Sequence, residues 1–268
     1  ILQFDLQIQV IPFVYGTLRE KIYKRSTLIL VRDPDKYNYL VTEKSYPGVK
    51  IVSDYNRVKV KEFDEASFLG KNKRVPLNIL FLNGFSVERS PETLVRAIPA
   101  IIEKHPDVIF TIVGSRNELE RRRVLDIAEA LHVERYVKLH NWDPEAAKYY
   151  QEAVIYVMAA KFIYANIALL EAMERGLVPI VSNVDKADLI VKDGVNGFMF
   201  DDTEKDLATK INLLISNFEQ RTKMGLRARN TIIETFDVRD RMNVVEEAIA
   251  KLQLSPSNTT LVPSPPEA

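Results

Sequence analysis

The chain has 268 residues, no cysteine, and equal numbers of basic and acidic residues, with 37 Lys plus Arg against 37 Asp plus Glu. Without cysteine, disulfides, thiolate zinc sites and cysteine nucleophiles are excluded. The balance of charge argues against a dedicated nucleic-acid binder, because neutralising phosphates requires a basic surplus. No apolar run reaches the roughly 18 residues of a membrane span, and the lack of cysteine suits a reducing cytosol, so we expect a cytoplasmic protein.

The first 65 residues contain short candidate elements separated by polar stretches. The chain begins with "ILQFDLQIQV", which has neither a Met nor the layout of a signal peptide and suggests a processed or truncated product. A helix that starts at Asp33 and Pro34 is favoured because these residues suit an N-cap and a first helical position. We expect strands within 1–13, 26–33 and 47–63, and helices over 17–26 and 34–44.

From Leu77 onward the pattern is steadier. Six short apolar runs predict strands over 78–83, 107–114, 135–140, 153–159, 177–182 and 197–200. Helical patterns cover 91–105, 116–133 and 144–152, a further helix begins near Asn166, and three more follow near 203–216, 219–235 and 237–252. Strands that alternate with helices indicate βαβ units, so we expect an α/β fold with a Rossmann-like parallel sheet and helices on both faces.

Parallel α/β sheets bind ligands at the carboxyl ends of their strands, near helix N-termini. The loops with the strongest expectation of function are therefore 83–91, 114–117, 140–144 and 159–166. The chain contains no G-x-G-x-x-G, so ordinary dehydrogenase and kinase interpretations lose their main support. The three histidines are spread over different elements without the spacing of metal ligands, and we expect no metal site.

Glu171 lies in an otherwise apolar helix, and two interpretations of it stay open. It is either a half-exposed charge near the helix start, which the helix dipole favours, or a group that grips a ligand. Asn166 is expected to cap this helix. It therefore marks free backbone N–H groups, including that of Ile167, which could receive a phosphate.

Two further candidate positions follow strands. Arg89 lies in the polar loop after the strand over 78–83, where it is either a solvated charge or a phosphate ligand. Asn141 follows the strand over 135–140 and precedes Trp142, whose ring either packs against the protein or flanks a ligand base.

Taken together, these loops are similar to those of a known family. Residues from about 78 to 245 resemble the donor-binding domain of group 1 glycosyltransferases, the retaining GT-B enzymes of glycosyltransferase family 4. The resemblance rests on the segments "ILFLNGFSVERSPETLVRAI", "FTIVGSRNELERRRVLDIAEALHVERYVKLHNWDPEAAKYYQEAVIYVMAA" and "ALLEAMERGLVPIVSNVDKADLIVKDGVNGFMF". Gly176, Asp193, Gly194 and Gly197 fall where the family pattern has the same residue types.

The resemblance implies that Glu171 grips the ribose hydroxyls of a nucleotide-sugar. The family's first signature glutamate corresponds to Ile163, and an Arg that faces the departing diphosphate corresponds to Gly84. The Lys five positions after that Arg corresponds to Arg89, which keeps the positive charge. No catalytic residue is identified, and the predicted nucleotide-sugar-binding residues are Arg89, Glu171, Asn166, Ile167 and Asn141.

The resemblance also predicts the domain organisation. Residues 1–65 are expected to be the remnant of an acceptor-side Rossmann-like domain, so that the N-terminal half is shortened, and residues 66–76 to be a linker. Residues 77–252 are expected to form the donor-binding domain. Residues 253–268, rich in Pro and Ser, are expected to be a disordered tail.

Two functions compete on this basis. In the first, which we favour slightly, the protein is an enzyme that moves a hexose from a UDP- or GDP-sugar to an acceptor hydroxyl with retention. It needs no cofactor, because Arg89 and helix N–H groups would stabilise the departing diphosphate. In the second, it is a catalytically inactive relative that binds nucleotides or scaffolds a partner chain or a homo-oligomer. The acceptor would be a glycan, a lipid or a protein, and a lipid would place the protein at the periphery of a membrane.

Overall fold

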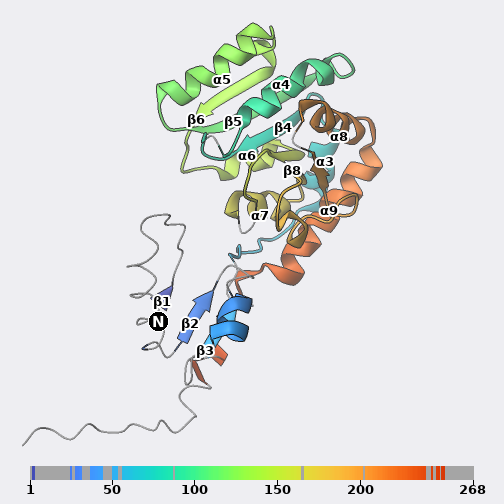
Figure 1. Cartoon of the computed structure of the whole chain (residues 1–268). Coiled ribbons are helices and arrows are strands. Elements are labelled where there is room, and N and C mark those ends of the chain that lie inside the picture. Colours follow the sequence, from blue (N-terminus) through green and yellow to red (C-terminus); the bar gives the residue numbers. More distant parts are fainter. Residues whose placement is uncertain are drawn as a thin grey trace, which may run out of the picture. The chain divides into compact units, whose positions relative to one another are not determined.

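The computed structural model describes residues 2–3, 25, 28–31, 37–44, 50–53, 56–86, 88–163, 166–201 and 203–239, and residues 243, 246, 247, 249 and 250. The chain divides into two compact units, one made of residues 1–55 and 239–268 and the other of residues 56–238 (Figure 1). Each unit has its own parallel sheet.

The first unit contains, in its described residues, a three-stranded sheet in the order β1-β2-β3. Its elements are β1 (Leu2–Gln3), β2 (Leu28–Val31), the π-helix η1 (Tyr39–Lys44) and β3 (Lys50–Ser53). Ile29, Val31 and Leu40 form its buried cluster. The strands expected within 26–33 and 47–63 are confirmed, and the helix expected over 34–44 is present in part as a π-helix. Apart from Arg25, which is helical, the helix expected over 17–26 lies outside the described residues, as does most of the strand expected over 1–13.

The second unit is built on a six-stranded parallel sheet in the order β6-β5-β4-β7-β8-β9, within the residues described. Its strands are β4 (Leu77–Leu82), β5 (Val108–Ser115), β6 (Val137–Asn141), β7 (Ile155–Met158), β8 (Val178–Ser182) and β9 (Phe198–Phe200). Every residue of β7 and β8 is buried, which explains why their sequences are continuous apolar runs rather than alternating patterns. All six expected strands are confirmed.

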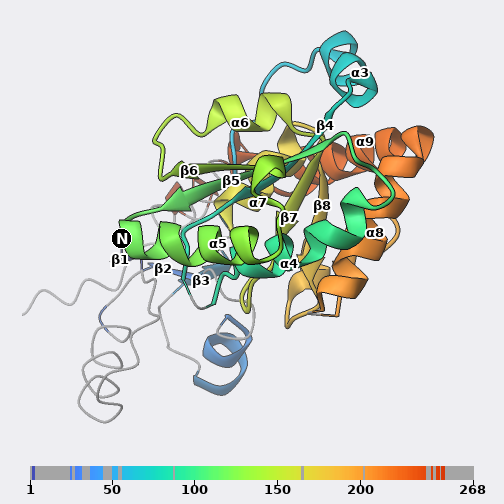
Figure 2. The ribbon, with the colours of Figure 1, turned by 90° about the horizontal axis from the view of Figure 1, so that it is seen from above.

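Helices cover both faces of this sheet (Figure 2). On one face, α4 (Pro91–Ile102) packs between α5 (Glu118–Ala130) and α8 (Glu204–Ser216). The other face carries α6 (Ala147–Glu152), α7 (Ile167–Glu174) and α9 (Phe218–Thr235), and α3 (Glu65–Lys73) packs against α9. Two short 3-10 turns, η2 (Glu134–Tyr136) and η3 (Ala187–Leu189), precede β6 and β9. The expected Rossmann-like α/β fold is confirmed.

Polar side chains fix where several helices begin. An N-cap side chain accepts a hydrogen bond from a backbone N–H three residues further on, which satisfies one of the donors that the first helical turn leaves free. In α5, α7, α8 and α9 these caps are Asn117, Asn166, Thr203 and Asn217. The expectation that Asn166 caps its helix is confirmed.

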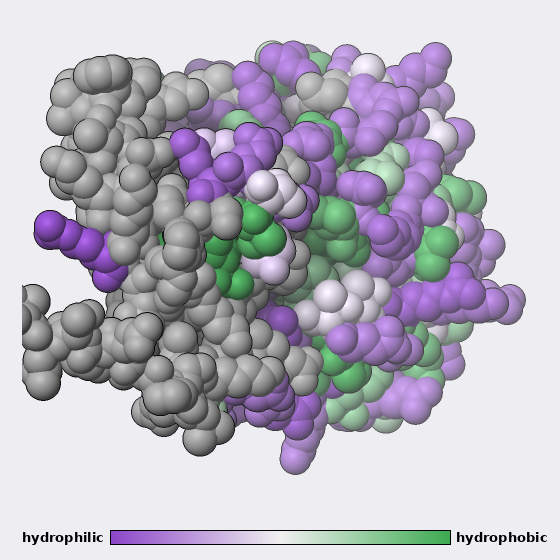
Figure 3. All heavy atoms as spheres, turned by 60° about the horizontal axis from the view of Figure 1, so that its bottom comes forward, coloured by the Kyte–Doolittle hydropathy of each residue, from purple (hydrophilic) through white to green (hydrophobic). Residues whose placement is uncertain are grey.

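The core of the second unit lies between the sheet and its helices. Phe81, Phe110 and Phe200 are among its largest fully buried side chains. On the face drawn in Figure 3, polar side chains cover most of the described surface, and apolar ones lie in small groups between them. Burial of the apolar core side chains is the dominant favourable term in folding, so this unit has its own source of stability.

The division of the chain differs in detail from the expected one. The linker expected over 66–76 consists largely of α3, which Asp64 caps by accepting from the Ser67 N–H at 3.1 Å. The second unit begins at residue 56, ahead of the expected boundary at 77, and it ends at residue 238 rather than 252. The helix expected near 237–252 lies largely outside the described residues, and the tail expected over 253–268 lies entirely outside them.

Candidate functional site

The loops that follow β4, β5 and β6 are fastened to one another. The pairing of β5 with β6 is irregular between Val113 and Ser115, where Gly114 has φ +137°. A Cβ at Gly114 would overlap the backbone carbonyl of Asn83, so glycine is required for the loop after β4 to approach β5 this closely. The Asn83 N–H donates to the Val113 carbonyl at 3.1 Å, and the Trp142 N–H donates to the Ser115 carbonyl at 2.7 Å. The loops at the carboxyl ends of β4, β5 and β6 therefore lie together at one edge of the sheet.

A hollow of about 320 Å³ lies at the ends of β5 and β6. Asn141 and Trp142 line one side of it, and Ser115 to Glu118 line the other. The Ser115 hydroxyl donates to the Asn141 side-chain oxygen at 2.9 Å, which leaves the Asn141 amide N–H₂ group for other partners. Trp142 is 60% exposed, so its ring offers a large apolar surface beside the hollow.

The loop after β4 carries Arg89 and is fixed to the segment after β7. The Ser90 N–H donates to the Ala159 carbonyl at 2.9 Å, and Arg89 forms an isolated β-bridge with Ala160. The Arg89 guanidinium lies beside Gly84, with Nη1 3.7 Å from the place where a Cβ on that glycine would be. Within the described part of the chain, the Arg89 guanidinium has no hydrogen-bond or ion-pair partner. It is a half-buried cation ready for an anion.

Glu171 is half-buried on α7 and contacts a tyrosine. The buried Tyr150 hydroxyl donates to the Ala168 carbonyl oxygen at 3.2 Å, and the Glu171 carboxylate lies close to the same hydroxyl. Burial raises the pKa of Tyr150, and the neighbouring Tyr156 and Glu171 raise it further, so Tyr150 stays a neutral donor. A carboxylate can accept about four hydrogen bonds, so Glu171 keeps acceptor capacity for a ligand.

The charges of Arg89 and Glu171 both influence the hydroxyl of Tyr156, on β7. It donates to the Leu82 carbonyl at 3.0 Å, where β4 ends. Burial raises the pKa of Tyr156, the Arg89 charge offsets part of that rise, and the Glu171 charge adds to it. Both charges therefore act on one hydroxyl between β4 and β7. That is the point where the strand order reverses, and open α/β sheets bind their ligands there.

The N-terminus of α7 lies in the loop after β7. The Asn166 side chain accepts from the Leu169 N–H at 3.1 Å, and Ile167 is 52% exposed. The first N–H groups of a helix have no partner within it and carry the positive end of its dipole. Anion binding by the N–H groups beside Asn166 and Ile167 stays a prediction.

Ile163 and Gly84 depart from the family pattern, and the structure shows the environment of each. Ile163 is 0% exposed, so its side chain is part of the packing and offers no polar group to a ligand. Gly84 leaves a space that the guanidinium groups of Arg89 and Arg116 approach. Tyr164 and Ala165, the two residues that follow Ile163, lie outside the described residues.

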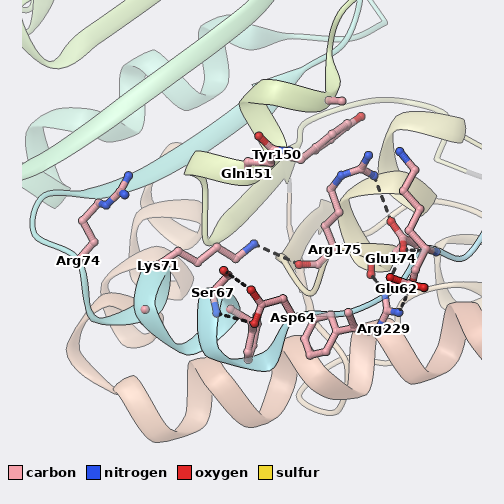
Figure 4. Close-up of a pocket in the computed structure, with 15 residues that line it drawn as sticks. Glu62, Asp64, Ser67, Lys71, Arg74, Tyr150, Gln151, Glu174, Arg175 and Arg229 are labelled. Atoms are coloured by element: carbon pink, nitrogen blue, oxygen red, sulfur yellow. Dashed lines mark hydrogen bonds and ion pairs between the residues drawn. The ribbon is translucent and has the colours of Figure 1, made fainter.

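A second hollow, of about 650 Å³, lies near the amino-terminal ends of the strands, between α3, α6 and the end of α7 (Figure 4). At its floor Glu174 is 2% exposed and accepts from Arg229 at 2.9 Å, from Arg175 at 3.1 Å and from the Lys61 N–H at 2.9 Å. Arg229 also donates to the Lys61 carbonyl at 2.7 Å and stacks over Phe63. This network joins α7, α9 and the segment before α3, so Glu174 has a structural role.

Lys71 projects into the same hollow from α3 and donates to the Arg175 carbonyl at 3.1 Å (Figure 4). Burial, with the nearby Arg175 charge, lowers the pKa of Lys71 to about 8, although Glu174 partly opposes the change. Arg175 lies over the Tyr150 ring, so Tyr150 extends from this hollow toward Glu171. Tyr150 therefore lies between this hollow and Glu171.

Several residues of these sites were not identified from the sequence. Arg116 lies in a loop that was expected to be functional, yet its approach to Gly84 depends on the packing of two distant loops. Glu174 follows Glu171 by three residues and was not distinguished from it, because charge pattern does not reveal burial. Within the described residues, no group of His, Asp or Glu side chains is arranged to hold a metal ion. No described helix has the length and apolar character needed to cross a membrane.

The fold is a Rossmann-like unit, and the candidate site lies at its topological switch point, between β4 and β7. Residues 63–231 match the model of the family described as glycosyl transferases group 1. The chain belongs to this family.

Curated relatives match the same part of the chain. Spore coat protein SA of Bacillus subtilis (strain 168) is 28% identical over 171 residues, which is 59% of this chain and 44% of that protein. The UDP-Gal:alpha-D-GlcNAc-diphosphoundecaprenol alpha-1,3-galactosyltransferase of Escherichia coli is 24% identical over 164 residues, 60% of this chain and 42% of that protein. The chain thus spans less than half the length of these relatives.

Solved structures show the same fold, that of GT-B glycosyltransferases. A glycosyltransferase from Rickettsia africae ESF-5 superposes with a TM-score of 0.73 at 17% identity, covering 92% of this chain and 69% of that one. Anabaena Alr3699/HepE in complex with UDP and glucose gives 0.72 at 16% identity, covering 92% and 71%. At these identities the likeness concerns the fold.

Proposed function

We propose that the protein acts as a retaining glycosyltransferase of family 4, which moves a hexose from a nucleotide-sugar to an acceptor hydroxyl. The observation that carries the proposal is the placement of Arg89 and Glu171. One is a guanidinium without a partner among the described residues, and the other is a half-buried carboxylate. Both influence the Tyr156 hydroxyl at the switch point of the sheet. A ligand with a phosphate at one end and a sugar diol at the other fits this pair.

Each group has a distinct role in the proposed reaction. The Glu171 carboxylate accepts hydrogen bonds from the ribose hydroxyls and fixes the orientation of the nucleotide. Arg89 and the first N–H groups of α7, beside Asn166 and Ile167, face the diphosphate. As the bond to the sugar breaks, negative charge builds on the diphosphate, and these fixed positive groups stabilise it. The acceptor, whether glycan, lipid or protein, attacks from a part of the site that these residues do not define.

UDP is the nucleotide that we expect first. The name of the Escherichia coli relative specifies UDP-Gal, and the solved neighbours include Anabaena Alr3699/HepE and the pneumococcal O-GlcNAc transferase GtfA, each in complex with UDP. The hollow beside Trp142 and Asn141 would receive the base, since an exposed indole suits a planar ring and the Asn141 amide supplies donors. GDP is the alternative nucleotide.

A second function is favoured by one specific observation. Ile163 is fully buried where the family pattern has a glutamate, so a polar contact near the transferred sugar is missing. The protein would then bind a nucleotide without transferring a sugar, as a non-catalytic subunit. Both functions require Glu171 to bind a nucleotide. They differ in whether a donor sugar is released.

The first experiment is calorimetric titration of the protein with UDP, GDP and UDP-glucose. We expect one nucleotide to bind at micromolar strength, near −8 kcal/mol. Glu171→Ala should weaken that binding by roughly 1–3 kcal/mol, because hydrogen bonds to a charged acceptor are lost. Glu234→Ala, an exposed acid on α9, is the matched control and should leave the affinity unchanged. Failure of all three ligands to bind at millimolar concentration would refute nucleotide binding.

Release of the sugar separates the two functions. If the protein is an enzyme, incubation with the bound UDP-sugar and a panel of acceptors should liberate UDP, and Arg89→Ala should slow this release. A protein that binds the donor tightly yet liberates no UDP with any acceptor would be the non-catalytic relative.

A further inference from the structure

Two guanidinium groups from different loops meet over Gly84. A Cβ placed on Gly84 would lie 3.7 Å from Arg89 Nη1, 3.8 Å from Arg116 Nη2 and 3.9 Å from Arg116 Cζ. Arg89 comes from the loop after β4, and Arg116 comes from the loop after β5. The space that a longer side chain at position 84 would enter is thus occupied by two cations.

The backbone holds Arg116 in this place. Its N–H donates to the Glu120 carboxylate at 2.8 Å, and the next residue, Asn117, caps α5. The close approach of Gly114 to Asn83 brings the loops after β4 and β5 together, so the exposed Arg116 lies on a loop beside Gly84. Arg116 is therefore presented by a well-defined turn.

Neither cation is neutralised by the protein. Among the described residues, the guanidinium groups of Arg89 and Arg116 have no hydrogen-bond or ion-pair partner. Like charges this close repel each other, so the folded protein gains when an anion lies between them. Guanidinium groups bind phosphate oxygens through paired N–H donors, which makes two of them a suitable cradle for a diphosphate.

We propose that Arg116 supplies the second cation of the diphosphate site, in place of the side chain that is absent at Gly84. The proposal rests on the function proposed above, because it assumes that a nucleoside diphosphate binds at this edge. Arg116 also lines the hollow that contains Asn141 and Trp142. A nucleotide whose base occupied that hollow would carry its phosphates past Arg116 toward Arg89 and the start of α7.

The test compares three probes, UDP, uridine and inorganic pyrophosphate, by calorimetry on the wild-type protein and Arg116→Ala. We expect the variant to bind UDP and pyrophosphate about 10- to 100-fold more weakly, as for lost charge-assisted hydrogen bonds, and to bind uridine unchanged. Arg96→Ala, an exposed arginine on α4, is the matched control. An equal loss for uridine would mean that Arg116 shapes the hollow rather than holding phosphate, and would overturn the proposal.

A loss of UDP affinity in Arg116→Ala could also arise from a local structural change, and a rescue variant distinguishes the two causes. Gly84 lies outside the left-handed region, a Cβ there meets its neighbours at ordinary contact distances, and Arg116→Ala vacates the space that the Arg116 guanidinium occupies. Gly84→Arg combined with Arg116→Ala should recover at least tenfold of the lost UDP affinity. If the double variant stays as weak as Arg116→Ala, the two positions are not interchangeable and the proposal fails.

The same data separate this proposal from the proposed function. If the wild-type protein binds UDP and Arg116→Ala binds it equally well, the role of Arg116 is refuted and nucleotide binding stands. If the wild-type protein binds pyrophosphate through Arg116 but binds no nucleoside diphosphate, the cation pair stands and the proposed function fails. If it binds neither, both are refuted.

Discussion

Glu171 and Glu174 lie three residues apart on α7 and have different environments. Glu171 is half-buried and lies near Tyr150. Glu174 is buried and holds Arg175 and Arg229. Sequence pattern treats the two carboxylates alike, since both sit in an apolar helix. The difference arises from the partners that other elements bring to them.

Replacing Glu174 should therefore cost stability. Glu174→Gln leaves the Arg229 guanidinium buried without its counter-charge, and breaking a buried ion pair in this way costs about 3 kcal/mol or more. We expect this loss in the free energy of unfolding measured by urea titration. Glu171→Gln is the control and should cost less than about 1 kcal/mol, because it removes the charge from one half-buried side chain. Equal losses would contradict the assignment of separate roles.

Lys71 should make stability depend on pH. Its pKa falls from 10.5 to about 8 in the folded protein, so the unfolded chain holds more protons above pH 8, and stability rises with pH between these two values. Between pH 7.5 and 9.5 this amounts to at most about 2 kcal/mol. Lys71→Met should abolish the increment in urea titrations at the two pH values. An unchanged increment in the variant would assign it to other groups.

At the scale of elements, α7 and α9 approach each other through glycine. A Cβ on Gly225, within α9, would overlap the backbone carbonyl of Gly176, just after α7. Gly176 has φ +73°, the left-handed conformation with which many helices end. The two glycines thus set the spacing of the helices that carry Glu171 and Arg229.

Gly225→Ala should push these helices apart and lower the free energy of unfolding by about 1–3 kcal/mol, as overpacking generally does. Gly70→Ala is the matched control. It also lies within a helix, α3, and no atom lies within 4 Å of its added Cβ, so it should be neutral or stabilise by up to about 1 kcal/mol. Thermal unfolding of both variants is the measurement. If Gly225→Ala instead stabilised the protein, α7 and α9 would have space for a methyl group between them, which would contradict this prediction.

The elements that could be predicted from sequence are those with a strong local pattern. Buried parallel strands such as β7 and β8 are continuous apolar runs, and helices such as α5 and α8 have polar caps and periodic apolar residues. The charged sequence of α3 is typical of a linker and does not by itself predict a helix. Its stability comes from the Asp64 cap and from burial of Phe68, which depends on tertiary contacts.

At the scale of the whole molecule, family membership resides in one of the two units. The match over residues 63–231 falls within residues 56–238, the unit with the six-stranded sheet. The first unit has its own parallel sheet and its own buried cluster around Ile29. Its role as a remnant of an acceptor-side domain stays a prediction.

The candidate site was predictable in part. The family pattern indicated Arg89 and Glu171, and in the structure the charges of both influence the pKa of Tyr156. Binding of a nucleotide by them stays a prediction. Arg116 could not be assigned in this way, because its approach to Gly84 requires two loops that are 32 residues apart in sequence to pack together. Arg116 and Gly84 are neighbours only in the folded structure, so the sequence alone does not indicate that one cation could replace another.

Trp142 is the single tryptophan of the sequence and is 60% exposed beside the hollow at the ends of β5 and β6. Its position gives the protein an intrinsic optical probe. The emission wavelength and intensity of indole fluorescence change when water around the ring is displaced or when an aromatic base stacks on it. Since no second indole contributes to the signal, emission from the unlabelled protein reports on this edge of the sheet, and occupancy of the hollow can be followed there in real time.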